Sequence, residues 1–337
     1  MTPIFPTSYS TLAAAPLGTL ISTRYGWNKS QCQLLLRGVS DTYSVFTSSG
    51  NFVLRIYRAG HRSLSQIHAE VELLIVLKNS DVSVSHPVAD RDGHYIFTVD
   101  AAEGTRHGVV FTHAPGKVYS SPTHSQLKLL GHEMAKFHAV STTIHLRDQR
   151  WNFDPETTLV KPLLDIKEYF WTSPEEYAWL QNAAEDATQK ISQLDLTPFT
   201  SGYCHFDFFP KNFHFEGDQS ITFFDFDFFG YGWVVNDIMT FHQHLCFEVE
   251  IGRMSEDISE QMFKIFIDAY REIRPLSQEE LSAIPLLSLG FWMFYFGFYT
   301  THDQFLPLLR NPHLTARVNL IRQITKRSAR LKYTLKK

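Results

Sequence analysis

Residues 201–237 read SGYCHFDFFPKNFHFEGDQSITFFDFDFFGYGWVVND, and this block decides how the whole chain is interpreted. It contains His205-Phe206-Asp207, then Asn212 five residues after that aspartate, and later Asp225 and Asp227. Carboxylate and amide side chains are thus concentrated in a segment that is otherwise strongly apolar. Groups of this kind in apolar surroundings need partners or a metal ion. The block is therefore the first place to look for chemistry.

A hairpin is predicted inside this block. Gly217-Asp218-Gln219 is typical of a turn, and it joins two short apolar strands at 212–215 and 221–224. The hairpin would bring the amide at its start close to the carboxylate at its end. Oxygen ligands of this kind suit Mg²⁺, which uses one or two carboxylates together with substrate phosphates. Asp207, on the preceding loop, would face the same space and could accept a proton from a hydroxyl group, as phosphoryl transfer requires.

The composition restricts the class of protein. The chain has 337 residues, with 31 Lys and Arg against 35 Asp and Glu, a net charge of −4. This near balance argues against a nucleic-acid-binding protein. Hydrophobic residues make up 44% of a chain long enough to bury a large core. The cysteines Cys32, Cys204 and Cys246 lie far apart without metal-ligand spacing, which favours a reducing compartment such as the cytoplasm.

The hydropathy pattern predicts neither a signal peptide nor a membrane-spanning helix. The N-terminus lacks a basic segment and carries early prolines, which makes it a poor signal peptide. The longest apolar run, 284–299, is shorter than the roughly 20 residues needed to span a bilayer and contains Pro285 and Gly290. We expect it to form a buried aromatic helix.

The first third of the chain predicts a small sheet. Its pattern indicates a helix at 9–25 that ends at Gly26, and then a meander of short strands and turns. The predicted strands are 33–36, 43–47 and 52–57, with turns at 38–42 and 48–51. Helical spacing follows over 65–79, and short strands are predicted at 82–88, 94–99 and 109–112.

After residue 113 the pattern changes. An amphipathic helix is predicted over 125–140, and most of the remainder outside the 203–237 block reads as helix. Strands with one helix followed by a mostly helical remainder indicate an α+β chain with two lobes. We place the smaller lobe at 1–113 and the larger at 114–337.

The motif His205-x-Asp207-x-x-x-x-Asn212, followed by 223–227 and Gly230-Tyr231-Gly232, closely resembles the aminoglycoside phosphotransferase and choline kinase-like enzymes, the phosphotransferase enzyme family. Segments 25–43 and 53–58 resemble the branch with type II homoserine kinases, hydroxylysine kinases and the stress-response kinase. The resemblance covers about residues 20–245. It implies a bilobal protein-kinase-like α+β fold. A small antiparallel-sheet lobe with one key helix would bind the nucleotide, and a larger helical lobe would carry catalysis and substrate binding.

The resemblance also implies roles for individual residues of the larger lobe. Asp207 would be the catalytic base, and His205 would orient the catalytic loop through hydrogen bonds. Asn212 and Asp225 would be magnesium ligands, and Asp227 a further ligand or a structural acceptor. Since phenylalanines surround both of the last two carboxylates, the sequence predicts that both are buried.

In the smaller lobe, the resemblance implies that Arg55 stands where a lysine touches the α- and β-phosphates. Glu70 would pair with it, with Glu72 as a second candidate. Two further sets would contact the nucleotide: Ser40, Asp41 and Thr42 over the phosphates, and the backbone of Phe111, Thr112, His113 and Ala114 at adenine. The chain departs from the pattern in the arginine itself, which keeps the charge but changes the geometry. It also has a reduced glycine loop in which only Gly38 remains.

One aspartate and one row of aromatic residues are expected mainly to stabilise the fold. Asp237 is expected to connect the catalytic loop with the following helix. An aromatic row is expected to pack in the core, with one or two rings lining the acceptor pocket: Trp292, Tyr295 and Tyr299.

These implications predict an ATP- and Mg²⁺-dependent phosphotransferase whose partner is a small molecule with a hydroxyl group. Homoserine, hydroxylysine, choline and aminoglycosides exemplify the acceptor class. Two alternatives stay open. The first is a protein Ser/Thr kinase of the stress-response type, and the second is a catalytically silent nucleotide-binding module, suggested by Arg55 and Gly38. The acceptor, the choice between ATP and GTP, and the oligomeric state are open at this stage.

Overall fold

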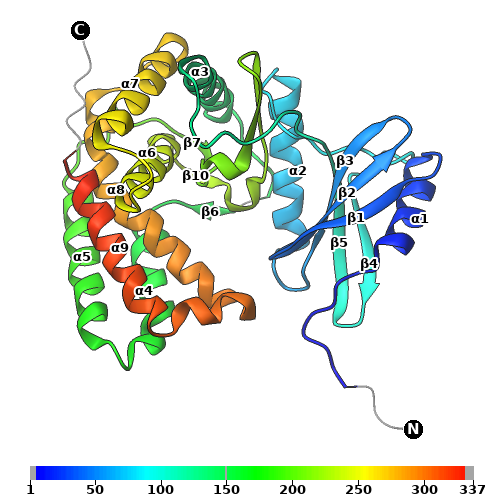
Figure 1. Ribbon diagram of the computed structural model, residues 1–337, viewed down its shortest axis with the longest axis horizontal. Helices are drawn as coiled ribbons and strands as arrows, with labels where there is room; N and C mark the ends of the chain where they lie inside the picture. The colour runs from blue at the N-terminus through cyan, green and yellow to red at the C-terminus, as the bar shows by residue number, and fades with distance from the viewer. Residues whose placement is uncertain (1–4, 149, 331–337) are drawn as a thin grey trace. The chain divides into compact units, whose positions relative to one another are not determined.

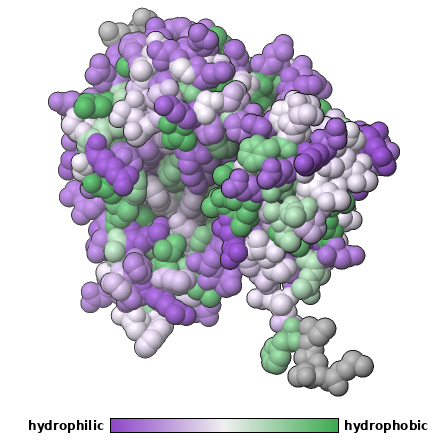
Figure 2. All heavy atoms as spheres, turned by 45° about the vertical axis from the view of Figure 1, so that its right-hand side comes forward, coloured by the Kyte–Doolittle hydropathy of each residue, from purple (hydrophilic) through white to green (hydrophobic). Residues whose placement is uncertain are grey.

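The computed structural model describes residues 5–148 and 150–330, which form two compact units (Figure 1). Unit 1 contains the chain up to Pro115 together with the short segments 145–148 and 222–224. Unit 2 contains 116–144, 150–221 and 225–330. Polar and charged side chains cover most of the face shown in Figure 2, and apolar ones are scattered among them, as is usual for protein surfaces.

Unit 1 is built on a five-stranded antiparallel sheet with the order β1-β2-β3-β5-β4. Its strands are β1 (Gln31–Arg37), β2 (Ser40–Thr47), β3 (Gly50–Tyr57), β4 (Ile96–Ala101) and β5 (Gly104–Thr112). Its helices are α1 (Ala14–Tyr25) and α2 (Leu64–Asn79). Leu17 and Ile21 of α1 share one buried cluster with Tyr43, Leu54 and Ile56 of the sheet.

The local sequence explains where these two helices begin and end. Helix α1 stops at Gly26, which takes the left-handed conformation (φ 65°) that glycine adopts without steric cost. Helix α2 starts with a capping box, in which Ser63 and Gln66 bind each other's backbone N–H groups.

Three elements of unit 1 differ from the sequence prediction. Helix α1 begins at Ala14, later than the predicted residue 9. The turn predicted at 38–42 is shorter, because Ser40 already pairs with Tyr57 in the β2–β3 ladder. The strand predicted at 82–88 is not formed: only isolated bridges occur there, at Val84 and Pro87. The proline explains this outcome, since it has no N–H group to donate to a ladder.

Unit 2 is mostly helical. Its α-helices are α3 (His124–Ser141), α4 (Lys161–Ile166), α5 (Pro174–Ser192), α6 (Val235–Glu250), α7 (Glu256–Ile273), α8 (Gln278–Phe298) and α9 (His313–Ser328). Short 3₁₀ or π turns are η1 (Glu156–Val160), η2 (Lys167–Phe170), η3 (Pro210–Asn212), η4 (Phe226–Phe228), η5 (Tyr299–Thr301) and η6 (Asp303–Leu309). Strands β6 (Trp151–Asn152), β10 (Gly230–Trp233) and β7 (Ser201–Cys204) form a small sheet. The predicted hairpin is present as β8 (Phe213–Glu216) and β9 (Ser220–Phe223).

Two packing features shape the helical part. Gly131 lets α3 approach α7 closely, because a Cβ atom there would lie 2.4 Å from the Phe266 carbonyl oxygen. Helix α8 carries the apolar run noted in the sequence. Within the described residues, the segment 278–301 is the one helix long and apolar enough to cross a membrane, and 72% of its most apolar window is buried inside the protein. The predicted burial of this aromatic helix is confirmed.

Candidate active site

The loop after strand β7 has a strained backbone at its centre. Phe206 lies in the left-handed region (φ 61°), which is uncommon for any residue other than glycine and costs about 1–3 kcal/mol. The surrounding structure must therefore fix it. The backbone N–H groups of His205 and Phe206 both donate to one carboxylate, Asp237 in the first turn of α6, at 2.8 and 2.7 Å.

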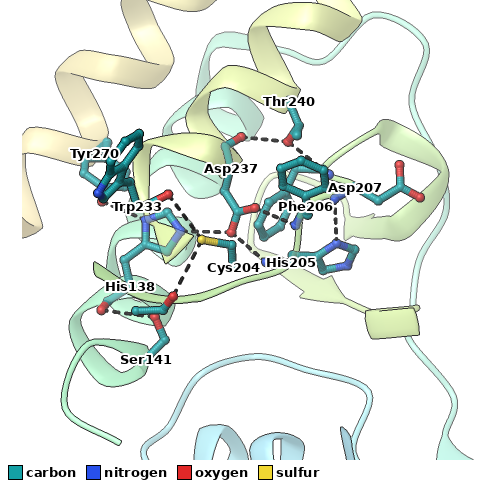
Figure 3. A network of polar contacts seen from close by, with 12 residues as sticks. His138, Ser141, Cys204, His205, Phe206, Asp207, Trp233, Asp237, Thr240 and Tyr270 are labelled. Carbon is teal, nitrogen blue, oxygen red and sulfur yellow. Dashed lines mark hydrogen bonds and ion pairs between the residues drawn. The ribbon is translucent and has the colours of Figure 1, made fainter. Parts of the chain in front are cut away.

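Asp237 is the centre of the polar network in Figure 3. Its carboxylate is fully buried and accepts a third hydrogen bond, from His138 Nε2 at 3.0 Å. Three donors and the positive end of the α6 dipole stabilise the charge. The same aspartate joins the loop to α6 through Thr240, whose hydroxyl donates to the Asp237 carbonyl oxygen and accepts from Phe208 N. The structural role expected for Asp237 is confirmed.

A chain of side chains extends this network to α7. Arg274 donates to the Tyr270 hydroxyl at 3.0 Å, so Tyr270 donates onward to His138 Nδ1 at 2.8 Å. Because Nδ1 accepts from Tyr270, the proton of the neutral His138 ring lies on Nε2, the atom that faces Asp237. Burial lowers the pKa of His138, so the ring is neutral. Sequence reasoning missed His138, because it lies on α3 without a recognisable motif.

His205 supports the backbone of Asp207, which lies two residues further along the chain. Its buried Nδ1 accepts a hydrogen bond from the backbone N–H of Asp207 at 3.2 Å. The ring centroid lies 4.6 Å from that of Phe208 and 4.4 Å from that of Phe226. These contacts fix the ring, and the ring in turn fixes the backbone that carries Asp207.

The Asp207 carboxylate points away from the network in Figure 3, and its two oxygens have different surroundings. Oδ2 accepts from Asn212 Nδ2 at 2.7 Å and from Lys211 Nζ at 2.9 Å. Oδ1 is buried and has no hydrogen-bond partner among the residues described. One oxygen is therefore held in place, while the other keeps its full capacity to accept a proton.

Lys211 was not predicted as a site residue, although it lies inside the quoted motif. Desolvation acts to lower its pKa, but the charges of Asp207 and Asp225 raise it overall, so the side chain is a cation. Because both carboxylates act on Lys211, Asp207 and Asp225 share the electrostatic surroundings of this cation.

The predicted metal ligands can be compared with the needs of Mg²⁺. Both amide protons of Asn212 are directed to Asp207, one to the carboxylate and one to its carbonyl oxygen at 2.8 Å. The amide oxygen is thus the atom of Asn212 left for a cation. In the described part of the chain no three His, Cys, Asp or Glu side chains form a metal cluster. An amide with one or two carboxylates fits Mg²⁺, which completes its shell with water and phosphate.

One prediction about these carboxylates was wrong. Asp225 is exposed, whereas Asp227 in η4 is buried, as expected. The left-handed backbone at Asp225 (φ 63°) explains the difference, because it interrupts the run of inward-facing phenylalanines at this residue. The segment is also anchored at Asp227, whose carbonyl oxygen accepts a hydrogen bond from Arg150.

In unit 1, Arg55 on β3 pairs with Glu70 on α2. The distance from Arg55 Nη1 to Glu70 Oε1 is 3.2 Å, and the Tyr57 hydroxyl donates to Glu70 Oε2 at 3.0 Å. Glu72 instead accepts from the backbone N–H of Arg147 at 3.1 Å. The structure thus selects Glu70 over Glu72 as the partner of the arginine.

Two of the residues predicted to contact the nucleotide already have other partners in unit 1. The Asp41 carboxylate is fully buried and accepts from Arg106 at 3.0 Å. The reason is that buried Arg106 requires a counter-charge. The backbone of Thr112 is already occupied, since its N–H donates to His86 O at 2.9 Å and its carbonyl oxygen accepts from Ser85 at 2.6 Å.

The other predicted residues of unit 1 lie at the ends of strands. Thr42 faces Arg55 across the β2–β3 ladder, and Ser40 begins β2. Phe111 is in β5, and the exposed His113 and buried Ala114 follow that strand.

Comparison with known proteins identifies the family of the chain. The sequence model of the phosphotransferase enzyme family matches residues 31–276. An uncharacterised protein from Deinococcus radiodurans is 30% identical, with 83% of this chain and 80% of that protein covered. Amicoumacin kinase from Bacillus subtilis is 26% identical, with 78% of each chain covered.

Two solved structures show the same fold. A microcompartment-associated aminopropanol kinase has a TM-score of 0.74 at 22% identity, covering 94% of this chain and 97% of that one. Amicoumacin kinase hAmiN in complex with AMP-PNP, Ca²⁺ and Ami has a TM-score of 0.72 at 20% identity, covering 93% of each chain. The chain belongs to the phosphotransferase enzyme family and has its kinase-like α+β fold.

Proposed function

We propose that this protein transfers the γ-phosphoryl group of ATP, with Mg²⁺, to a hydroxyl group of a small molecule. The observation that supports it most strongly is the asymmetric surroundings of Asp207. One carboxylate oxygen is held by Asn212 and Lys211, and the other is buried without a partner among the described residues. A carboxylate held in this way can accept the proton of an attacking alcohol.

In the proposed reaction, the acceptor oxygen forms a bond to the γ-phosphorus and its proton passes to Asp207. The bond from that phosphorus to the bridging oxygen breaks, and ADP leaves with the electron pair. Asn212 and Asp225 would hold Mg²⁺, with Asp227 as a further ligand or a structural acceptor, and the metal would neutralise charge on the phosphates. His205 keeps the loop in place through its bond to Asp207 N.

For the nucleotide we propose a site that uses residues 1–113, while 114–337 provides catalysis and acceptor binding. Arg55, held by Glu70, would contact the phosphates. Ser40 and Thr42 would lie beside them, and the chain at 111–114 would meet adenine without the Thr112 backbone. A cytoplasmic location, where ATP is abundant, fits three cysteines that are all free and buried.

For the acceptor we propose an amino alcohol or a related amine-bearing hydroxyl compound. One structural neighbour is called an aminopropanol kinase, and the family resemblance includes homoserine and hydroxylysine kinases. The decisive experiment measures ADP release from ATP and Mg²⁺ with homoserine, 1-amino-2-propanol, hydroxylysine, choline and an aminoglycoside. We expect at least one of these alcohols to stimulate release and to yield a phosphate ester.

Asp207→Asn tests the assignment of the base. Loss of a general base typically costs about 10²–10⁴-fold in turnover, and we expect ATP binding to be retained. Asp186→Asn is the matched control, because Asp186 is a surface residue whose carboxylate pairs with Lys190, and it should behave like the parent chain. Turnover that survives in Asp207→Asn contradicts the assignment.

The two alternative functions give different results in the same assay. A protein kinase would label itself or a protein, and amino alcohols would not compete with that labelling. A silent module would bind ATP but release no ADP with any alcohol. The Arg55–Glu70 pair argues against the silent module, because the cation proposed to contact the phosphates is paired with a carboxylate on α2.

A further inference from the structure

A second buried polar atom near Asp207 also lacks a well-formed hydrogen bond. The Tyr295 hydroxyl, on α8, is shielded from solvent and makes no hydrogen bond of good geometry with any residue that the structure describes. Burial raises the pKa of Tyr295 well above its usual range, and the charge of the Asp207 carboxylate and a hydrogen-bonding contact with it add to the effect. The phenol therefore keeps its proton and is a potential donor.

Tyr295 Oη and Asp207 Oδ1 are complementary. Most buried polar atoms in proteins have a well-formed hydrogen bond, whereas these two make at most a poorly aligned one with each other. One atom belongs to a phenol that can donate, and the other belongs to a carboxylate that only accepts. An alcohol satisfies both, because its O–H donates to the carboxylate while its oxygen accepts from the phenol.

The tyrosine ring is held firmly enough to define where its hydroxyl lies. Its centroid lies 5.1 Å from that of Phe291 and 5.2 Å from that of Phe228, both with edge-to-face geometry. Lys211 Nζ lies 5.9 Å from the same centroid. The ring is thus fixed by α8 and η4, and the cation that binds Asp207 Oδ2 lies beside it.

We propose that the Tyr295 hydroxyl binds the acceptor alcohol and holds its oxygen against Asp207. This inference rests on the proposed function and adds to it a second protein contact at the reacting oxygen. One lone pair of that oxygen accepts from Tyr295, and the other attacks the γ-phosphorus. As the new O–P bond forms, the alcohol proton moves to Asp207 Oδ1, and the bond to the ADP oxygen breaks.

Tyr295→Phe tests the proposal because it removes one oxygen atom and keeps the ring. The probe is the alcohol of the panel above that gives the parent chain its highest kcat/KM. We expect the KM for this alcohol to rise about 3–10-fold, the effect of one lost hydrogen bond. The KM for ATP should stay within about twofold, and kcat should change less than the KM for the alcohol.

Tyr177→Phe is the matched control. It removes a hydroxyl from α5 that donates to the Leu163 carbonyl oxygen at 3.3 Å, and it should leave both KM values unchanged. Thermal unfolding provides a second measurement. Since the Tyr295 hydroxyl makes no well-formed hydrogen bond with a described residue, Tyr295→Phe should unfold at the parent temperature or above it.

The possible failures are distinguishable. An unchanged KM for the alcohol, an equal rise in both KM values, or a clear loss of thermal stability in Tyr295→Phe would overturn the role of the tyrosine while leaving the proposed function intact. A parent chain that transfers phosphate to none of the alcohols overturns the proposed function, and this inference with it.

Discussion

Replacing Asp237 by asparagine should destabilise unit 2 strongly, and the size of the effect can be estimated from its three hydrogen bonds. Oδ2 accepts from His205 N and His138 Nε2, and Oδ1 accepts from Phe206 N. In Asp237→Asn the amide oxygen can keep the pair at Oδ2. The amide NH₂ then faces the N–H of Phe206, so one bond to a charged group, worth about 1.5–3 kcal/mol, is lost.

The two bonds that remain also weaken. They change from charge-assisted to neutral, which roughly halves their strength and costs about 1–2 kcal/mol more. Burying a neutral amide needs less desolvation than burying a carboxylate, and this offsets part of the loss. We therefore expect the free energy of unfolding to fall by about 2–4 kcal/mol.

Urea unfolding followed by tryptophan fluorescence measures this change. All tryptophans except Trp27 lie in unit 2, so the signal reports mainly on that unit. The matched control is Asp186→Asn, where the carboxylate pairs with Lys190 at the surface and the loss should be within about 1 kcal/mol. If both variants unfold at the same urea concentration as the parent, the network around Asp237 does not hold the loop and our reasoning is refuted.

Three further predictions concern other parts of the chain. Arg55→Met should raise the KM for ATP about 10–100-fold, as expected for a lost charge-assisted contact, and Arg55→Lys should restore most of the affinity; equal KM values in initial-rate assays would argue against a phosphate contact. Burial lowers the pKa of His242 and of His244 to about 4, whereas the unfolded chain takes up protons below about pH 6.5. Stability should therefore fall from about pH 6.5 towards 4, by up to about 1.4 kcal/mol per pH unit for each histidine, and urea midpoints that stay constant between pH 7 and 5 would contradict this. Gly131→Ala should cost about 1–3 kcal/mol in thermal unfolding, because its Cβ would lie 2.4 Å from the Phe266 carbonyl oxygen; an unchanged transition would show that α3 and α7 can separate freely.

Much of the fold could be predicted because its signals are local. Helix α2 follows the spacing of its apolar residues and starts at a capping box, and α1 ends at a glycine. The β8–β9 hairpin surrounds the turn that Gly217 begins. The motif from His205 to Asn212 is equally local, and its spacing brings the asparagine amide onto Asp207.

What the sequence did not predict depends on contacts between distant segments. His138 reaches Asp237 from α3, and only the packed structure shows which histidine does so. Asp41 was placed among nucleotide contacts because nothing local reveals that buried Arg106 binds it. Asp225 was expected to be buried because of its neighbours, but one left-handed residue reversed that expectation.

Glu70 accepts from the Tyr57 hydroxyl as well as from Arg55, and this has a consequence for the proposed turnover. Because the Tyr57 hydroxyl binds its second oxygen, the arginine can turn towards a nucleotide without stranding a carboxylate in the interior. A guanidinium group carries five N–H donors, so Arg55 need not give up one partner entirely to engage another. In the proposed reaction, the strand and helix that carry the pair would remain rigid while their charge is shared, so that release of ADP would leave the protein ready for the next cycle.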